Sequence, residues 1–147
     1  MTKLRVLSAA DFELIKALFK EAFTAPPRSE DWSDDGQLNE YLLDLINVRT
    51  PLLLGLYDGG EAVGISVGNI RHWCSGTEYF IEELCIRPGR QGQGLGREFF
   101  RLIKEHLTGI GINQIYLNTE RELPACGFYR HLGFTELTGH TSFFTEF

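Results

Sequence analysis

The sequence has few of the features that mark several large classes of protein. Its 147 residues include only three cysteines, Cys74, Cys85 and Cys126, with no C-x-x-C pair and no histidine at metal-ligand spacing. No apolar run approaches the roughly 18 residues of a membrane-spanning helix, and the N-terminal residues lack the apolar core of a secretory signal. We therefore expect no disulfide framework, no metal site, no membrane partner and a cytoplasmic location.

Positive charge is also scarce. The chain has 14 lysines and arginines against 20 aspartates and glutamates, a net charge of −6, and its basic residues form no cluster. A surface that follows a phosphate backbone needs concentrated positive charge, so no nucleic-acid partner is expected. The acidic balance instead favours cationic partners.

The apolar content and the length of the chain are typical of one folded domain. With 43% apolar residues, a chain of this length can bury roughly 70% of its unfolded surface without disulfides or a structural metal. No internal repeat, low-complexity tract or long linker divides it. Residues 1–147 are therefore expected to form a single domain.

Hydrophobic periodicity predicts a succession of strands and helices. Ser8 and Asp11 form a capping-box pattern before a helix, which Pro26 and Pro27 must end. Expected helices cover 12–23, 38–46, 95–107 and 124–132, and expected strands cover 4–7, 51–57, 62–70, 77–87, 112–118 and two pieces of 134–147. The order β-α-α-β-β-β-α-β-α-β-β predicts an α/β (α+β) fold, a mixed, mostly antiparallel sheet of about seven strands with helices on both faces.

Three glycines, Gly92, Gly94 and Gly96, alternate where a strand is expected to pass into a helix. The free N–H groups and the dipole of a helix start attract an anion, and missing side chains let the backbone come close, so the pattern favours phosphate binding. Glycines that serve only the turn are the alternative. The dinucleotide fingerprint would need glycine at position 97 and the Walker A loop would need lysine there, so Arg97 excludes both.

The motif that does fit is Q-x-x-G-x-G, from Gln91 to Gly96, after a strand of the form x-L-x-I-x-P. It resembles the acetyl-coenzyme A motif of the GNAT acetyltransferase superfamily. Residues 124–134, Pro-Ala-Cys-Gly-Phe-Tyr-Arg-His-Leu-Gly-Phe, resemble the A-x-x-F-Y-x-x-x-G-F signature of the same family. The element order matches as well, so the resemblance covers essentially the whole chain. Within the family the chain is similar to small bacterial aminoglycoside 6'-N-acetyltransferase-like proteins and to spermidine, spermine and diamine acetyltransferases.

The resemblance implies an acetyl-coenzyme A-dependent N-acetyltransferase that needs no metal and moves the acetyl group directly to an amine. Backbone amides of residues 91–97 would hold the pyrophosphate, and the pantetheine arm would pair with the edge of residues 84–86 like an added strand. Cys85 would be a small buried hydrophobe and no covalent nucleophile. The implied coenzyme-binding residues are Leu84, Cys85, Ile86, Gln91, Gly92, Gln93, Gly94, Leu95, Gly96 and Arg97.

Glu82 and Tyr129 are the catalytic candidates. An alkylammonium has a pKa near ~10, so a carboxylate that removes its proton helps the transfer. Residues 81–84, Ile-Glu-Glu-Leu, are similar to the L-E-D-F segment of spermidine/spermine acetyltransferases, in which the first acid is the base. Tyr129 occupies the position of the family's general acid. Strand alternation would send Glu82 and Glu83 to opposite faces, with only one at the cleft. The alternatives are that Glu82 and Glu83 are structural carboxylates and that Tyr129 is only a packed aromatic ring.

An acidic segment between the first two expected helices indicates a cationic acceptor. An acidic rim with an exposed aromatic attracts a small polycationic amine, aminoglycoside-like or polyamine-like, and the candidate residues are Trp32, Asp31, Asp34 and Glu83. The alternative is a solvated segment whose acids cap the second helix. A peptide or protein amine as acceptor, a non-catalytic coenzyme A-binding module, and a homodimer joined through residues 141–147 are further hypotheses.

Overall fold

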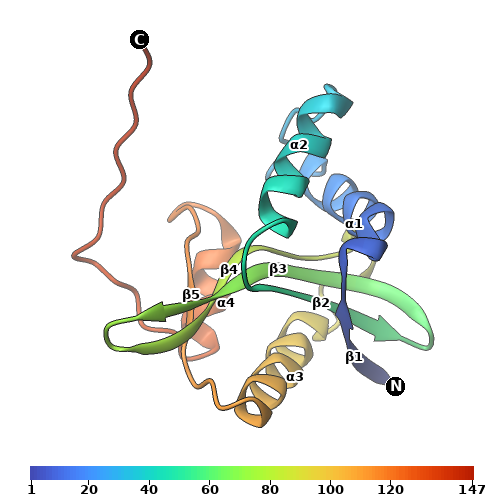
Figure 1. Cartoon of the computed structure of the whole chain (residues 1–147). Coiled ribbons are helices and arrows are strands. Elements are labelled where there is room, and N and C mark those ends of the chain that lie inside the picture. The colour runs from blue at the N-terminus through green and yellow to red at the C-terminus, as the bar shows by residue number, and fades with distance from the viewer.

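The computed structural model describes residues 1–147 as one five-stranded sheet with helices on both faces (Figure 1). The strand order is β1-β2-β3-β4-β5, and all neighbours are antiparallel except the parallel pair β4 and β5. This confirms a mixed, mostly antiparallel sheet. The elements are β1 (Thr2–Leu7), α1 (Phe12–Thr24), α2 (Asp35–Ile46), β2 (Pro51–Asp58), β3 (Glu61–Trp73), β4 (Gly76–Ile86), α3 (Leu95–Gly109), β5 (Ile115–Leu117) and α4 (Pro124–His131), with short 3-10 turns at Ala9–Asp11 and Pro88–Arg90.

Local signals place the first helix where the sequence predicts it. The Ser8 hydroxyl accepts a hydrogen bond from the Ala10 N–H at 3.2 Å, and the Asp11 carboxylate accepts one from the Ser8 N–H at 2.9 Å. This reciprocal pair confirms the capping box, because each side chain satisfies a backbone donor that has no partner in the helix. The helix then ends at Thr24, before Pro26 and Pro27.

The sheet is buried on both faces, and each face has its own core. Helices α1 and α2 cover one face, and α3 covers the other (Figure 1). Strand alternation assigns neighbouring residues to different cores, so Leu53 packs toward α1 and α2 while Leu54 packs toward α3. Helix α4 joins the α3 side, where Phe128 lies 6.1 Å from Phe100 between ring centroids. No helix in the structure is both long enough and apolar enough to cross a membrane.

A bulge interrupts the pairing of β3 with β4 at the middle of the sheet. Val67 is opposite Glu83 and Gly68 is opposite Ile81, so Glu82 is an extra residue without a partner on β3. The extra residue reverses the alternation of β4: Ile81 belongs to the core under α3, whereas Cys85 belongs to the core under α1 and α2. Glu83, two residues before Cys85, therefore also faces α1 and α2.

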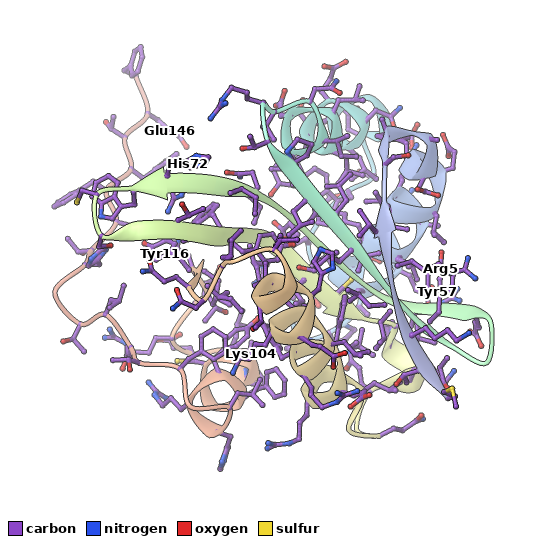
Figure 2. All side chains as sticks on the ribbon, turned by 60° about the horizontal axis from the view of Figure 1, so that its bottom comes forward. Arg5, Tyr57, His72, Lys104, Tyr116 and Glu146 are labelled. Carbon is purple, nitrogen blue, oxygen red and sulfur yellow. The ribbon has the colours of Figure 1, made fainter.

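Residues 134–147 contain no strand, so the two strands expected there are wrong and the sheet has five strands instead of about seven. After Phe134, the only backbone hydrogen bond made by an N–H of this segment joins the His140 N–H to the Leu137 carbonyl. The end of the segment extends away from the body of the molecule, and Glu146 lies far out on it (Figures 1 and 2). Aromatic and β-branched residues favour an extended chain, but a strand also needs a pairing partner, which this segment does not have.

Candidate active site

The glycine loop offers a row of free backbone donors at the start of α3. Gly92 and Gly94 have φ angles of +75° and +78°, a conformation that suits glycine and strains other residues, and Gly94 is the N-cap of α3. The N–H groups of residues 92–97 have no acceptor within the protein. The Gln91 side chain donates to the Ile86 carbonyl at 3.0 Å and ties the loop to the end of β4. This arrangement fits a bound pyrophosphate, because the donors and the helix dipole act on the same anion.

One cavity of about 1000 Å³ runs from this loop to the acidic pair on β4. It brings together Glu82, Glu83, Tyr129 and all but one of the expected coenzyme-binding residues, namely Leu84, Cys85, Ile86, Gln91, Gly92, Gly94, Leu95, Gly96 and Arg97. Gln93 lies outside it and accepts a hydrogen bond from Arg90 at 3.2 Å instead. Its side chain therefore helps to hold the loop.

The sheet splits beside the acidic pair. Strand β5 pairs with β4 only at Tyr79, Phe80 and Ile81, whereas β4 continues to Ile86. Beyond Ile81, the edge of β4 that would face β5 has free backbone donors and acceptors, and it lines the cavity. An extended chain with amide groups, such as a pantetheine arm, can pair with such an edge.

Both residues of the pair line the same cavity, whereas regular alternation predicts that at most one of them reaches it. The bulge is the reason, since it takes Glu82 out of the regular pleat and turns Glu83 toward α1 and α2. Glu83 is largely enclosed, and burial raises the pKa of its carboxyl to about 7. Glu82 is exposed, and partial burial raises its pKa against the opposing effect of Arg71.

Tyr129 presents its hydroxyl to the cavity from α4. Its ring is held by aromatic neighbours, with centroid distances of 5.8 Å to Phe100 and 5.4 Å to Phe134. The hydroxyl makes no hydrogen bond to another protein group. Burial first, and the charge of Glu83 second, raise the pKa of Tyr129 to about 12. The group is therefore a protonated phenol at neutral pH, able to donate a proton to a leaving group.

Cys85 is a thiol in this environment. Its sulfur lies 3.8 Å from the Leu18 carbonyl oxygen, to which it donates, and burial raises its pKa to about 12. A thiolate is the nucleophilic form of cysteine, so a group this reluctant to ionise is unsuited to covalent catalysis.

The expected acceptor residues of the acidic segment lie outside the cavity. Asp34 caps α2 by accepting from the Gln37 N–H at 3.0 Å, and Asp31 accepts from the Ser33 N–H at 3.0 Å. Trp32 is half-buried rather than exposed, and its ring stacks on Tyr41 with centroids 5.3 Å apart. The cavity wall on this side is formed by Ala22, Phe23, Pro26, Pro27 and Arg28.

Two residues that sequence reasoning missed shape the site. Tyr41 donates to the Glu83 carboxylate at 2.6 Å, although its spacing marks it only as part of the apolar face of α2. A tyrosine on such a face often directs its hydroxyl to a buried acceptor, and that is the available signal. Gly68 lies opposite the bulge, where a Cβ atom would be 2.1 Å from the Phe80 carbonyl oxygen. A glycine inside a strand often marks a bulge.

The sequence model of the acetyltransferase (GNAT) family matches residues 12–134, so the chain belongs to this family of acetyltransferases. No curated protein sequence matches the chain. The family match spans the glycine loop, the acidic pair and Tyr129, which are the parts that the cavity joins.

Solved structures share the fold at low sequence identity. A possible acetyltransferase from Clostridium difficile 630 has a TM-score of 0.79 at 15% identity, covering 100% of this chain and 98% of that one. The aminoglycoside N-acetyltransferase AAC(6')-Iy in complex with CoA has a TM-score of 0.72 at 17% identity, covering 99% and 94%. A ribosomal-protein-alanine N-acetyltransferase from Brucella melitensis biovar Abortus 2308 has a TM-score of 0.72 at 14% identity, covering 100% of both chains.

Proposed function

We propose that this acetyltransferase moves the acetyl group of acetyl-coenzyme A directly to a primary amine of a small, polycationic acceptor. The observation that carries the proposal is the single cavity that joins the anion-binding loop, the free edge of β4, the two carboxylates and the Tyr129 hydroxyl. Acetyl-coenzyme A supplies the acyl group as a thioester. The structural neighbour AAC(6')-Iy, which was solved with CoA, supports the same choice of cosubstrate.

The coenzyme end of the cavity is built from backbone. The N–H groups of residues 92–97 bind the pyrophosphate, and the free edge of β4 from Leu84 to Ile86 binds the arm that carries the thioester. A backbone N–H of the same edge stabilises the oxyanion that forms during transfer. Substitution of side chains along this edge therefore has little effect on the oxyanion.

Glu83 takes the proton from the acceptor amine. At a pKa of about 7 it is substantially ionised at neutral pH and still basic enough to accept a proton, which is the range that favours general-base catalysis. Sequence similarity ranks Glu82 first, but Glu82 is the more exposed of the two. We assign Glu82 to binding the ammonium group of the acceptor and Tyr129 to protonating the departing thiolate.

The charges at the acceptor end favour a cation. Glu82 and Glu83 line the cavity together with Arg28, and Arg28 is already neutralised by Glu30 at 2.7 Å. An acceptor with several ammonium groups would find uncompensated negative charge there. The aminoglycoside acceptors named for a structural neighbour are polycations of this type.

The test is thiol release from acetyl-coenzyme A with a panel of kanamycin-type aminoglycosides, spermidine, diamines, lysine analogues and short peptides, against a no-acceptor control. Acetylation of an aminoglycoside or polyamine supports the proposal. Acetylation of peptides alone would assign the chain to the protein-directed alternative. Tight coenzyme binding with no transfer to any acceptor would favour a binding module.

Variants separate the roles of the acids and the loop. Glu83→Gln is expected to remove turnover while acetyl-coenzyme A still binds, and Glu82→Gln is expected mainly to raise the KM for the acceptor. Gly94→Glu is expected to prevent coenzyme binding, because it strains a left-handed position and adds an anion beside the pyrophosphate. Full turnover in Glu83→Gln would contradict the role given to this carboxylate.

The C-terminal segment supports a homodimer. Phe143 and Phe144 are 94% and 86% exposed, and β5 forms an edge of the sheet with one side unpaired. Exposed aromatics and an unpaired strand edge are both unfavourable in water and are both covered when two copies associate. We therefore propose that residues 141–147 of one copy pack against the β5 edge of the other.

A further inference from the structure

We propose that Tyr41 is a positioning residue for the Glu83 carboxylate, and that through Trp32 and Glu30 it couples this carboxylate to Arg28, which lines the acceptor end of the cavity. The inference rests on the proposed function, in which Glu83 takes the proton from the amine. It adds the group that orients this acid and a physical link between acceptor binding and proton transfer.

The first link is the hydrogen bond from Tyr41 to Glu83. The donor and acceptor oxygens are 2.6 Å apart, a short distance typical of a hydroxyl that donates to an ionised carboxylate. Burial raises the pKa of Tyr41, so its hydroxyl stays protonated and remains a donor. The bond joins α2 to β4 across 42 residues of sequence and holds one oxygen of Glu83, leaving the other for the amine.

The second link is the packing that holds the Tyr41 ring. Trp32 stacks on it with centroids 5.3 Å apart and planes 24° apart, and Phe19 contacts both rings, at 5.9 Å from Tyr41 and 5.5 Å from Trp32. A ring fixed between two aromatic neighbours directs its hydroxyl in one direction. The position of the Tyr41 hydroxyl is therefore set by this packing, and the hydroxyl in turn orients the Glu83 carboxylate.

The third link connects Trp32 to the cavity wall through Glu30. The Trp32 indole N–H donates to one oxygen of Glu30 at 2.9 Å, and Arg28 donates to the other oxygen at 2.9 and 2.7 Å. Arg28 lines the cavity, as Glu83 does. The contacts thus form a chain, Arg28 to Glu30 to Trp32 to Tyr41 to Glu83, that starts and ends at the same wall. An acceptor that displaces Arg28 would leave Glu30 held by Trp32 alone, and so would alter the support of the base.

The charged and titratable groups around Glu83 come from four parts of the chain. Arg28 and the Tyr41 hydrogen bond lower the pKa of Glu83, and Glu30 and Glu82 raise it, all against the larger effect of burial. Tyr129 lies close enough on α4 for Glu83 to raise its pKa in turn. Of the groups that shift the pKa of Glu83, Tyr41 is the one that can be replaced without a change in charge.

The test is Tyr41→Phe, with the titration of Glu83 followed by NMR of 13C-labelled side-chain carboxyls and assigned with Glu83→Gln. We expect the pKa of Glu83 to rise by about one unit, because a hydrogen bond that stabilises the carboxylate is lost. The acid limb of kcat/KM for the best acceptor of the panel is expected to shift upward by the same amount, with the plateau at high pH retained. A merely structural role would lower the rate at every pH without moving this limb.

Two further variants complete the test. Tyr57→Phe is the matched control: Tyr57 lies under Arg5 at the β1–β2 side of the sheet, with 4.3 Å between the Arg5 guanidinium carbon and the ring centroid, and lines no part of the cavity (Figure 2). It should leave the Glu83 titration unchanged. Trp32→Phe keeps an aromatic ring against Tyr41 but removes the bond to Glu30, and should shift the titration in the same direction by a smaller amount.

Different results would overturn the inference and the proposed function. An unchanged Glu83 titration in both Tyr41→Phe and Trp32→Phe would overturn the inference, whatever the activity. Full turnover in Glu83→Gln would overturn the proposed role of Glu83, even with the titration shifted. A shifted titration and a shifted acid limb, with the Tyr57→Phe control unchanged, would support both.

Discussion

At the scale of single residues, one cavity holds two groups in different protonation states at neutral pH. Burial raises the pKa of both, to about 12 for Tyr129 and about 7 for Glu83. The same physical cause therefore keeps the phenol fully protonated and leaves the carboxyl close to half-ionised. A donor and an acceptor of protons within one site are what transfer between a thioester and an amine requires.

Tyr129→Phe is predicted to lower kcat by about 100-fold or more, because the phenyl ring keeps the packing but has no proton to donate. The affinity for acetyl-coenzyme A should change little, since the donors proposed to bind the pyrophosphate are backbone groups of residues 92–97. Steady-state kinetics and calorimetric coenzyme binding measure the two effects. An unchanged kcat would show that the proton comes from another source.

Glu83 is also predicted to make stability depend on pH. Its folded pKa of about 7 lies above the unfolded value of 4.5, so the folded state binds the proton more tightly, and this contribution to stability is present below pH 4.5 and lost as the pH rises through 7. The unfolding free energy of Glu83→Gln minus that of the native chain should therefore be roughly 2 kcal/mol larger at pH 8 than at pH 5. Urea unfolding of both proteins at both pH values measures this difference. Glu82→Gln, at an exposed position, is the control, and its difference from the native chain should change less.

At the scale of elements, the bulge in β4 decides how the acids are presented. A regular strand would place Glu82 and Glu83 on opposite faces, whereas the extra residue sets both at one cavity. The bulge also lies where β5 stops pairing with β4. The split edge and the acidic pair therefore share one structural cause.

Gly68→Ala is predicted to cost about 3 kcal/mol or more of stability and to remove activity. A Cβ atom would lie 2.1 Å from the Phe80 carbonyl oxygen and 2.7 Å from the Tyr79 ring, and backbone atoms cannot move aside without changing the bulge. Thermal and urea unfolding measure the loss. The matched control is Gly109→Ala, where a Cβ meets nothing within 4 Å and the change should stay within about 1 kcal/mol. Equal stability of the two variants would contradict the packing argument.

At the scale of the whole molecule, the projecting C-terminal segment has the properties of an interface. Beyond α4 the chain forms no strand, yet it carries Phe143 and Phe144 in exposed positions (Figure 1). Covering such side chains yields about 25 cal/mol per Å² of apolar area. The four helices and the five strands are already packed without these exposed side chains.

If the chain forms the proposed homodimer, the double variant Phe143→Ser, Phe144→Ser is predicted to be a monomer, because it removes apolar area that the second copy would cover. Light scattering coupled to gel filtration measures the mass of both forms. The variant should unfold with about the same free energy as the native chain, because neither side chain belongs to a core of the single chain. A native chain that is monomeric at tens of micromolar would contradict the dimer.

Much of the fold follows from patterns that act over a few residues. The capping box at Ser8, the end of the first helix before Pro26 and the glycine loop before α3 are short-range features, and each is present where the sequence predicts it. Hydrophobic periodicity likewise locates all nine α-helices and strands, because burial on one face imposes a period of 3.6 or 2 residues. The family motifs lie in these same elements.

What the sequence determined by itself is therefore the order of the elements, the glycine loop, and the presence of the acidic pair and the tyrosine on which the proposed acyl transfer rests. The tertiary structure alone decided that Glu82 and Glu83 share a cavity, that Trp32 is half-buried against Tyr41, that Tyr41 donates to Glu83, and that residues 135–147 have no strand partner within the chain. The reason is physical: local patterns record which face of an element is buried, whereas register, bulges and contacts between distant residues depend on how the elements pack.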